Sequence, residues 1–412
     1  MERYLPRLVD RTLGELLRSH PAVLLTGPRA TGKTTTALRF AKSAIRLDRP
    51  EQAAVVSADP DGALIDLARP TLVDEWQISP EILGAVKRAV DSNPQRGQFI
   101  VTGSVRGDLD SPTWPGTGRL IRMEMSGLTP AELSRHIPRT PVLDRLADGD
   151  LSQLRTAPPR LSLRDYLGAA LTSGFPEPAL RLDGRGRVRW LDSYVEQLLT
   201  RDLAEIAERR DPARLRRFLE VYALHTAGVA DLTSLASTAG VSRPTGDAYH
   251  RLLQNLLVVQ NVPAWWTNRL KRLAKSPKHY LVDAALVAAI VRVDLAGLMR
   301  DSDLLGRILD TFVMSQLRAE LPRCDSRPRL YHLRDQDGRR EVDIIVEYGG
   351  GRVLGLEVKA TSAPKPADGR HLSWLRDELG DRFIGGIVLH TGARPLSLGD
   401  RIVAAPISSV WS

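Results

Sequence analysis

Short, mainly apolar segments alternate with longer mixed stretches in the first third of the chain. Residues 22–25, 71–73 and 98–101 are such segments. Apolar runs of this length bounded by turn signals predict buried strands, and the mixed stretches between them predict helices. A regular alternation of strand and helix is typical of a doubly wound α/β core.

The middle of the chain, residues 128–224, follows a helical period instead. One apolar set recurs at spacings of three and four residues with charged residues between its members, which predicts an amphipathic helix. Residues 173–178, Ser-Gly-Phe-Pro-Glu-Pro, interrupt this pattern as a loop. We expect a helical lid and connector here. The apolar set consists of Leu191, Tyr194, Val195, Leu198 and Leu199.

Residues 231–259 predict two short helices separated by a turn. The turn is residues 239–242, and Ser242 is a favourable N-cap for the second helix. Residues 258–262 then resemble a strand. This order predicts a winged helix. The inward-facing positions are Leu232, Leu235 and Ala236 in the first helix and Ala248, Leu252, Leu253 and Leu256 in the second.

The last third predicts a helix followed by a β-hairpin. Residues 307–317 have a helical pattern, residues 341–347 and 352–359 alternate, and three glycines separate the alternating segments. If Tyr348 pairs with Arg352, partner numbers sum to 700, and Asp343 lies opposite Glu357 on one face. Val342, Ile344, Val346, Leu354, Leu356 and Val358 are then expected to cover the other face.

Length and composition fit several globular domains. The chain has 412 residues, 42% of them hydrophobic and 26% charged, which excludes a disordered chain. We expect an ATPase core in 1–135, a connector in 136–224, a winged helix in 225–268 and a nuclease-like α/β domain in 269–412. The single cysteine excludes a disulfide framework and a zinc–thiolate site. Without an apolar run near ~20 residues or a signal-peptide core, a cytoplasmic protein is expected.

A glycine-rich segment between a predicted strand and a predicted helix matches GxxxxGK[ST]. Its backbone N–H groups converge on one point, which suits a polyphosphate. Lys33 is expected to reach the β- and γ-phosphates of ATP, and the Thr34 hydroxyl to ligate Mg²⁺. The predicted nucleotide site consists of Gly27, Pro28, Arg29, Ala30, Thr31, Gly32, Lys33, Thr34 and Thr35, the last of these beginning the helical continuation to Ala41.

Two further segments complete the expected ATP site. Asp74 is expected to hold Mg²⁺ through its water shell, and Glu75 to orient and deprotonate the attacking water. An ordinary acidic strand end is the alternative. Ser104 or Thr102, at the end of the next strand, is a candidate sensor of the γ-phosphate. Arg119 is a candidate arginine finger toward a neighbouring subunit, which would require an oligomer. Loop, acidic pair and sensor strand in this order resemble an AAA-type ATPase.

Positive charge concentrates around the predicted wing. Lys and Arg total 58 against 49 Asp and Glu, a formal charge of +9, which suggests a polyanionic partner although an Arg-rich proteome contributes to it. Residues 242–279 hold seven basic residues and one acidic residue, Asp247. A solvated basic face on a packing module is the alternative to DNA contact. The predicted DNA-binding residues are Arg243, Arg251, Arg269, Lys271, Arg272, Lys275 and Lys278.

The hairpin carries the Asp…Glu-x-Lys pattern of PD-(D/E)xK nucleases. Opposed carboxylates of Asp343 and Glu357 repel unless a cation lies between them, and Mg²⁺ would supply that charge. Lys359 would orient the water or stabilise charge on phosphorus, and Asp310 on the preceding helix is a further metal ligand. The alternative is a hairpin with surface ion pairs only. We therefore expect a restriction-endonuclease-like domain with a metal set of Asp310, Asp343 and Glu357.

Taken together, these segments resemble a prokaryotic family of ATP-binding proteins with an AAA-type N-terminal domain and a C-terminal domain of unknown function, DUF4143. The resemblance covers nearly the whole chain and implies a C-terminal domain similar to restriction endonucleases in fold. One departure is Asp310, where the family usually has Glu. The segments that carry the resemblance are residues 27–34, 72–77, 101–104, 174–177, 269–272, 275–278, 310–313 and 356–359.

Three functions follow from these patterns. The leading hypothesis is a Mg²⁺-dependent ATPase that binds DNA and couples hydrolysis to DNA remodelling or to movement of the nuclease-like domain. The second is a Mg²⁺-dependent DNA nuclease regulated by ATP. The third is a nucleotide-switched regulatory assembly whose nuclease-like domain is inactive.

Overall fold

The structure, a computed structural model, describes residues 4–105, 118–155, 160–206, 211–229, 231–267, 275–335 and 338–412. The chain forms two compact units. Unit 1 comprises residues 1–128, 175–177 and 253–258, and unit 2 comprises 129–174, 178–252 and 259–412. Among the described residues, no helix combines the length and apolar character needed to cross a bilayer.

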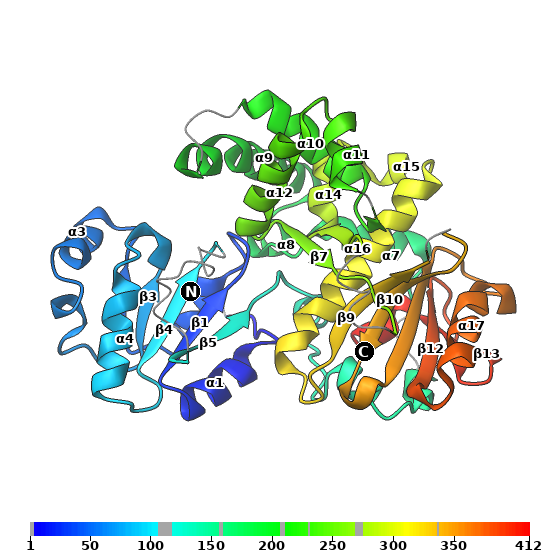
Figure 1. Cartoon of the computed structure of the whole chain (residues 1–412), viewed down its shortest axis with the longest axis horizontal. Coiled ribbons are helices and arrows are strands. Elements are labelled where there is room, and N and C mark those ends of the chain that lie inside the picture. The colour runs from blue at the N-terminus through cyan, green and yellow to red at the C-terminus, as the bar shows by residue number, and fades with distance from the viewer. Residues whose placement is uncertain are drawn as a thin grey trace. The chain divides into compact units, whose positions relative to one another are not determined.

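Unit 1 is built on a parallel five-stranded sheet in the order β2-β3-β4-β1-β5 (Figure 1). The apolar segments of the sequence form three of its strands, which confirms the predicted α/β core. Helices α1 (Asp10–Ser19), α2 (Lys33–Ala37), α3 (Pro50–Ala58) and α4 (Ile82–Ser92) accompany the sheet. The strands are β1 (Ala22–Thr26), β2 (Ser43–Arg46), β3 (Thr71–Asp74), β4 (Phe99–Gly103) and β5 (Leu120–Glu124).

Both faces of this sheet are buried because successive strand residues enter different clusters. Leu24 and Val101 pack with residues of α4, whereas Val23 and Ile100 pack with residues of α1. Helix α2 ends at Ala37, earlier than the expected helical continuation to Ala41. Strand β4 lies between β1 and β3, so the carboxyl ends of three parallel strands meet at one edge. Ligand sites of open α/β sheets form at such edges.

The middle of the chain is helical, as predicted. The five apolar positions expected on one face of a helix all lie in α9 (Gly184–Ile206), and all are buried. Further helices are α5 (Pro130–Leu133), α6 (Val142–Arg145), α7 (Leu163–Thr172), α8 (Pro176–Leu180), α10 (Pro212–Leu224), α14 (Ala284–Ile290), α15 (Leu295–Leu298) and α16 (Ser302–Glu320).

The predicted pair of short helices is present as α11 (Leu232–Thr238) and α12 (Arg243–Asn255). A small antiparallel sheet accompanies them, in which β8 (Lys278–Leu281) is the central strand between β6 (Gly228–Val229) and β7 (Val259–Val262). The order along the chain is therefore helix, strand, two helices and two strands, starting at α10.

The C-terminal part of unit 2 contains a six-stranded mixed sheet in the order β13-β14-β12-β11-β10-β9. The predicted hairpin register is confirmed: Ile344 pairs with Leu356 and Glu347 with Val353, so that partner numbers sum to 700. The strands are β9 (Arg329–Arg334), β10 (Glu341–Glu347), β11 (Val353–Lys359), β12 (Phe383–His390), β13 (Leu396–Gly399) and β14 (Ile402–Pro406).

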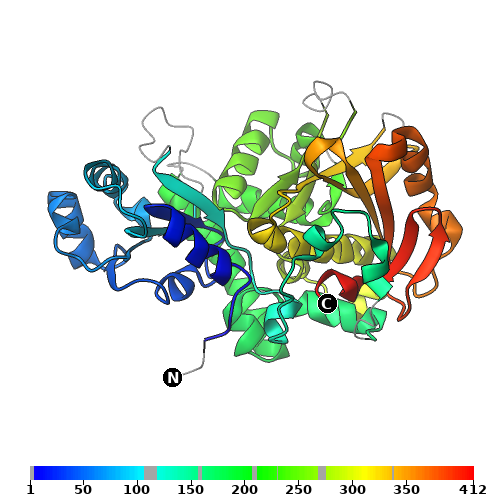
Figure 2. The ribbon, with the colours of Figure 1, turned by 90° about the horizontal axis from the view of Figure 1, so that it is seen from below.

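Two features of this sheet differ from simple alternation. Helix α16 and helix α17 (Arg370–Leu379) lie on opposite sides of the sheet (Figures 1 and 2), so buried residues occur at consecutive positions of β10. In addition, the β9–β10 register shifts by one residue between Val342 and Ile345. The extra residue on β10 is a bulge, and bulges change the direction of nearby side chains. Asp343 lies within this bulge.

A glycine substitution tests the packing of unit 2. Gly149 has φ +79°, and a Cβ atom there would lie 2.8 Å from the backbone carbonyl oxygen of Ile384. We expect Gly149→Ala to lower the free energy of unfolding by about 1–3 kcal/mol in urea denaturation. Gly168→Ala, in helix α7, is the matched control: beyond its chain neighbours and its own helix backbone, the added Cβ would meet no atom within 4 Å. It should raise the free energy of unfolding by about 0.5–1 kcal/mol. Equal changes in the free energy of unfolding for the two substitutions would contradict the close contact between Gly149 and Ile384.

Candidate functional site

The glycine-rich loop between β1 and α2 forms a tight backbone turn. A Cβ atom on Gly27 would lie 2.2 Å from the carbonyl oxygen of Met125, so only glycine fits there. The buried guanidinium of Arg7 donates to the carbonyl oxygens of Thr31 (2.8 Å) and Ser126 (2.8 Å). Arg7 therefore ties the loop to the segment that follows β5. The sequence analysis did not identify this residue.

Lys33 lies inside the loop. Its Nζ donates to the carbonyl oxygens of Gly27 (3.0 Å) and Pro28 (2.8 Å), and its side chain is buried. Burial lowers the pKa of Lys33 to about 8. These carbonyl groups hold the ammonium next to the backbone amides that are expected to receive phosphate.

Asp74, at the end of β3, is hydrogen-bonded to one side chain from α2 and one from β4. Its Oδ1 accepts hydrogen bonds from the hydroxyls of Thr34 (2.8 Å) and Thr102, and its Oδ2 lies 3.6 Å from Nε of Arg46. The carboxyl is almost completely buried, and burial raises its pKa although the two hydroxyls partly oppose this shift.

Thr34 and Asp74 fit the magnesium ion that a phosphate loop implies. Both contribute hard oxygen atoms, which are the ligands that Mg²⁺ prefers. Their hydrogen bond shows that the hydroxyl and the carboxylate reach the same point beside the loop.

Glu75 follows β3 in a left-handed backbone conformation (φ 59°, ψ 51°). Its Oε2 accepts hydrogen bonds from the Gln77 side-chain amide and from the Ser104 hydroxyl, the latter at 3.2 Å. Arg29 Nε donates to the same hydroxyl at 3.3 Å. The two sensor candidates thus contact different acids, Thr102 contacting Asp74 and Ser104 contacting Glu75. Gln77 was missed in the sequence analysis.

Arg119 forms an ion pair with Asp91 of α4, its Nε lying 2.7 Å from Oδ1. The side chain is 43% exposed. Its role as an arginine finger stays a prediction.

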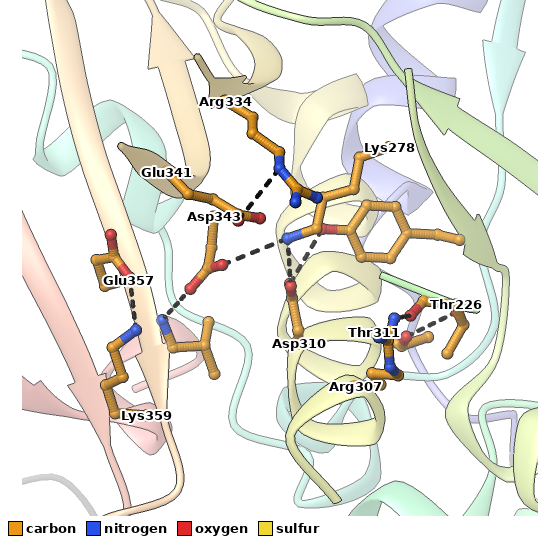
Figure 3. A network of polar contacts seen from close by, with 12 residues as sticks. Thr226, Lys278, Arg307, Asp310, Thr311, Arg334, Glu341, Asp343, Glu357 and Lys359 are labelled. Atoms are coloured by element: carbon orange, nitrogen blue, oxygen red, sulfur yellow. Dashed lines mark hydrogen bonds and ion pairs between the residues drawn. The ribbon is translucent and has the colours of Figure 1, made fainter. Parts of the chain in front are cut away.

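A second cluster of charged side chains lies where α16, β8 and the β10–β11 hairpin meet (Figure 3). Lys278 Nζ donates to Asp310 Oδ2 at 2.6 Å and to Asp343 Oδ1 at 3.4 Å. The Tyr280 hydroxyl donates to Asp310 Oδ1 at 3.0 Å.

The hairpin supplies the remaining contacts of this cluster. The Val358 N–H donates to Asp343 Oδ2 at 2.9 Å, and Lys359 Nζ donates to Glu357 Oε2 at 2.7 Å. The structure thus brings Asp310 and Asp343 to the same ammonium group, with Glu357 close to Asp343.

Burial and charge shift the pKa values of this cluster in opposite directions. Burial raises the pKa of Asp310 to about 6 and raises that of Glu357 well above its usual value, the second also because Asp343 is close. Burial alone would raise the pKa of Asp343, but the ammonium groups of Lys278 and Lys359 hold it below its usual value.

The structure corrects two expectations about Lys278 and the acids. Lys278 is 1% exposed and therefore does not belong to an exposed basic stripe. In addition, the described residues contain no group of three or more acidic, histidine or cysteine side chains arranged to hold a metal ion. The predicted set of Asp310, Asp343 and Glu357 does not fit Mg²⁺ here, because the Lys278 ammonium already contacts both aspartates.

Unlike Lys278, the other predicted DNA-binding residues that the structure describes are not buried inside the charged cluster. Arg243 and Arg251 are exposed on α12, and Arg243 Nε lies 4.0 Å from Asp247 Oδ2. Lys275 Nζ lies 5.0 Å from the ring centre of Trp266, a cation–π contact. Arg269, Lys271 and Arg272 lie outside the described residues.

The parallel sheet, the glycine loop and the hydrogen-bonded Thr34–Asp74 pair are typical of the P-loop core of AAA-family ATPases. Residues 19–134 match the AAA domain family. Residues 163–296 match a domain of unknown function, DUF8612, and residues 305–410 match another, DUF4143.

Two mycobacterial proteins are similar over nearly the whole chain. The uncharacterized protein Rv2008c of Mycobacterium tuberculosis is 29% identical over 404 residues, covering 97% of this chain and 82% of that protein. The uncharacterized protein Mb2031c of Mycobacterium bovis gives the same values: 29% over 404 residues, 97% and 82%.

Three solved structures are similar to parts of this chain, each with a TM-score below 0.5. A Walker-type ATPase of Pyrococcus abyssi has 17% identity and a TM-score of 0.41, covering 69% of this chain and 94% of that one. A RuvB variant of Thermotoga maritima has 21% identity and a TM-score of 0.28, covering 62% and 89%. DnaA of Aquifex aeolicus, bound to AMPPCP, has 15% identity and a TM-score of 0.28, covering 60% and 86%.

A substitution at Thr102 tests the junction of the strand ends. Its hydroxyl donates to Asp74 and accepts from the Glu75 N–H at 3.3 Å, so Thr102→Val leaves both partners with one hydrogen bond fewer. We expect the free energy of unfolding to fall by about 1–3 kcal/mol in urea denaturation. Thr238→Val, at an exposed position of α11, is the matched control and should change it by less than about 0.5 kcal/mol. A Thr102→Val protein as stable as the control would show that the hydrogen bonds of the Thr102 hydroxyl do not stabilise the fold.

Proposed function

We propose that the protein is a Mg²⁺-dependent ATPase that binds DNA and uses ATP hydrolysis to remodel DNA or to move its C-terminal domain. The observation that carries the ATPase part is the meeting of Thr34, Asp74 and Glu75 beside the glycine loop. These residues supply a metal-binding hydroxyl, a metal-binding carboxylate and a separate carboxylate for the attacking water.

In this proposal each residue of the loop has a defined task. The backbone N–H groups of residues 27–34 cradle the β- and γ-phosphates, and Lys33 turns from the carbonyl oxygens of Gly27 and Pro28 toward them. Thr34 and Asp74 would hold Mg²⁺, and the ion would supply positive charge to the phosphate groups. Arg29 is proposed to interact with the terminal phosphate, and its contact with Ser104 supports this.

Glu75 is the proposed base. It orients the attacking water and takes its proton, and the hydrogen bonds from Gln77 and Ser104 fix the direction of its carboxylate. Because Ser104 also contacts Arg29, a phosphate that draws Arg29 away would change the hydrogen bonding of Glu75. Gln77 and Ser104 are therefore proposed as positioning residues.

The order of elements around α11 and α12 supports the proposal of DNA binding. Helix, strand, two helices and two strands is the order of a winged helix, in which the last helix enters the major groove. Arg243 and Arg251 are exposed on that helix and suit phosphate contact. Lys275 and three residues outside the described part of the chain, Arg269, Lys271 and Arg272, stay proposed DNA-binding residues, whereas Lys278 is no longer one of them.

A regulatory role without DNA cleavage is the second candidate function. The observation that favours it over a nuclease is the Lys278 ammonium at the two aspartates of the restriction-endonuclease-like site. ATP turnover would then change how the C-terminal domain contacts a partner. An oligomer with Arg119 supplied to a neighbouring subunit is compatible with either function.

Conservative substitutions separate hydrolysis from binding. Glu75→Gln removes the proposed base while keeping its size, so we expect ATP turnover to fall by about 10²-fold or more with nucleotide binding retained. Glu51→Gln, at an exposed position of α3, is the matched control and should leave turnover unchanged. Phosphate release in steady state measures the effect. Turnover unaffected by Glu75→Gln would exclude the assigned role of this residue.

Neutralising α12 tests the DNA surface. We expect Arg243→Gln with Arg251→Gln to weaken binding of a DNA duplex and to reduce the salt slope by about two, since two phosphate contacts are lost. Fluorescence anisotropy at several salt concentrations measures both quantities. Arg185→Gln with Arg214→Gln removes the same charge from exposed positions of α9 and α10 as a control. Equal loss in both double variants, or no binding by the unaltered protein at low salt, would refute the surface.

A further inference from the structure

We infer that Lys278 is the resident cation of the cluster formed by Asp310, Asp343 and Glu357, in the position that a divalent metal takes in a three-carboxylate site. The unaltered cluster then binds no divalent ion, and a neutral side chain at position 278 converts it into a divalent-metal site. This inference is independent of the proposed ATPase.

The position of Lys278 is fixed by the small sheet. Lys278 lies on the central strand β8 and pairs with Val229 on one side and with Val262 on the other. Its side chain is 1% exposed and ends between the two aspartates, as Figure 3 shows. Backbone pairing on both sides of the strand fixes the Cα position of Lys278, and the ion pairs with Asp310 and Asp343 hold the buried ammonium between the two carboxylates.

The aspartate oxygens are already occupied by protein donors. Asp310 accepts from Lys278 and from the Tyr280 hydroxyl, one at each oxygen. Asp343 accepts from Lys278 and from the Val358 N–H in the same way. A Mg²⁺ ion bound about 2.1 Å from Asp310 Oδ2 would lie within about 5 Å of the Lys278 ammonium, in a buried environment where like charges repel strongly.

Glu357 provides a second observation that points to a ligand position. Its side chain is 3% exposed, and its Oε1 has no hydrogen-bond partner among the described residues. A buried acceptor without a partner is costly. Once the charge at position 278 is removed, this oxygen and the carboxylates of Asp310 and Asp343 offer hard ligands from three elements, α16, β10 and β11.

The experiment measures Mn²⁺ uptake by calorimetry on the full chain without nucleotide. All proteins carry Thr34→Ala, which removes one of the two proposed metal ligands of the ATP site. We expect no Mn²⁺ uptake that depends on Asp343 when Lys278 is present. Lys278→Met, which has a similar length without charge, should gain one Mn²⁺ per chain, and adding Asp343→Asn should remove it. Lys278→Arg keeps the charge and should gain none.

Thermal unfolding provides a second readout. Lys278→Met leaves two buried aspartates without their cation, so its melting temperature should fall, and Mn²⁺ should raise it again only while Asp343 is present. Mn²⁺ uptake that depends on Asp343 in the protein with Lys278 would overturn the inference. A folded Lys278→Met protein that takes up no Mn²⁺ would also overturn it. If Lys278→Met does not fold, Lys278→Gln takes its place in the same Mn²⁺ titration and must gain one Mn²⁺ per chain that depends on Asp343. The protein with Lys278 must still show no such uptake.

Discussion

The hydrogen bonds that Asp74 accepts from Thr34 and Thr102 are the interaction on which the N-terminal site depends. Asp74 ends β3, Thr102 lies near the end of β4, and Thr34 lies in the first turn of α2, which follows β1. They meet because β4 lies between β1 and β3. A carboxylate as buried as Asp74 needs such donors, since an unpartnered buried charge is strongly unfavourable. The same arrangement that stabilises the sheet edge therefore also places the Asp74 carboxylate, which is the proposed metal ligand, next to the glycine loop.

In the C-terminal cluster, buried carboxylates are stabilised mainly by lysine ammonium groups instead of hydroxyl groups. Three acidic side chains approach one another there, and two lysines provide the compensating charge, Lys278 from the small sheet and Lys359 from the hairpin. Breaking a buried ion pair by removing one partner commonly costs several kcal/mol. The cluster thus links α16, β8 and the hairpin within unit 2, and the Asp…Glu-x-Lys sequence pattern on the hairpin does not by itself imply cleavage.

Local patterns predicted much of this structure. The phosphate loop, the acidic pair and the sensor strand could be recognised because each is a short, continuous segment of the sequence with a characteristic residue pattern. The hairpin register followed from the glycine turn and the alternation around it. Long-range contacts were not predictable in this way. Lys278 lies 32 residues from Asp310 and 65 from Asp343, so its local basic surroundings suggested a surface role. Arg7 likewise contacts Ser126, 119 residues away.

The central claim is that the glycine loop binds ATP together with Mg²⁺, and calorimetric titration of ATP into the purified full chain tests it most directly. The account predicts one ATP per chain in the presence of Mg²⁺, much weaker binding when the metal is chelated, and no detectable binding by Lys33→Ala. It also predicts that in Asp74→Asn the affinity for ATP is nearly the same with Mg²⁺ present as with the metal chelated. No uptake of ATP by the unaltered protein with Mg²⁺ present would contradict the account.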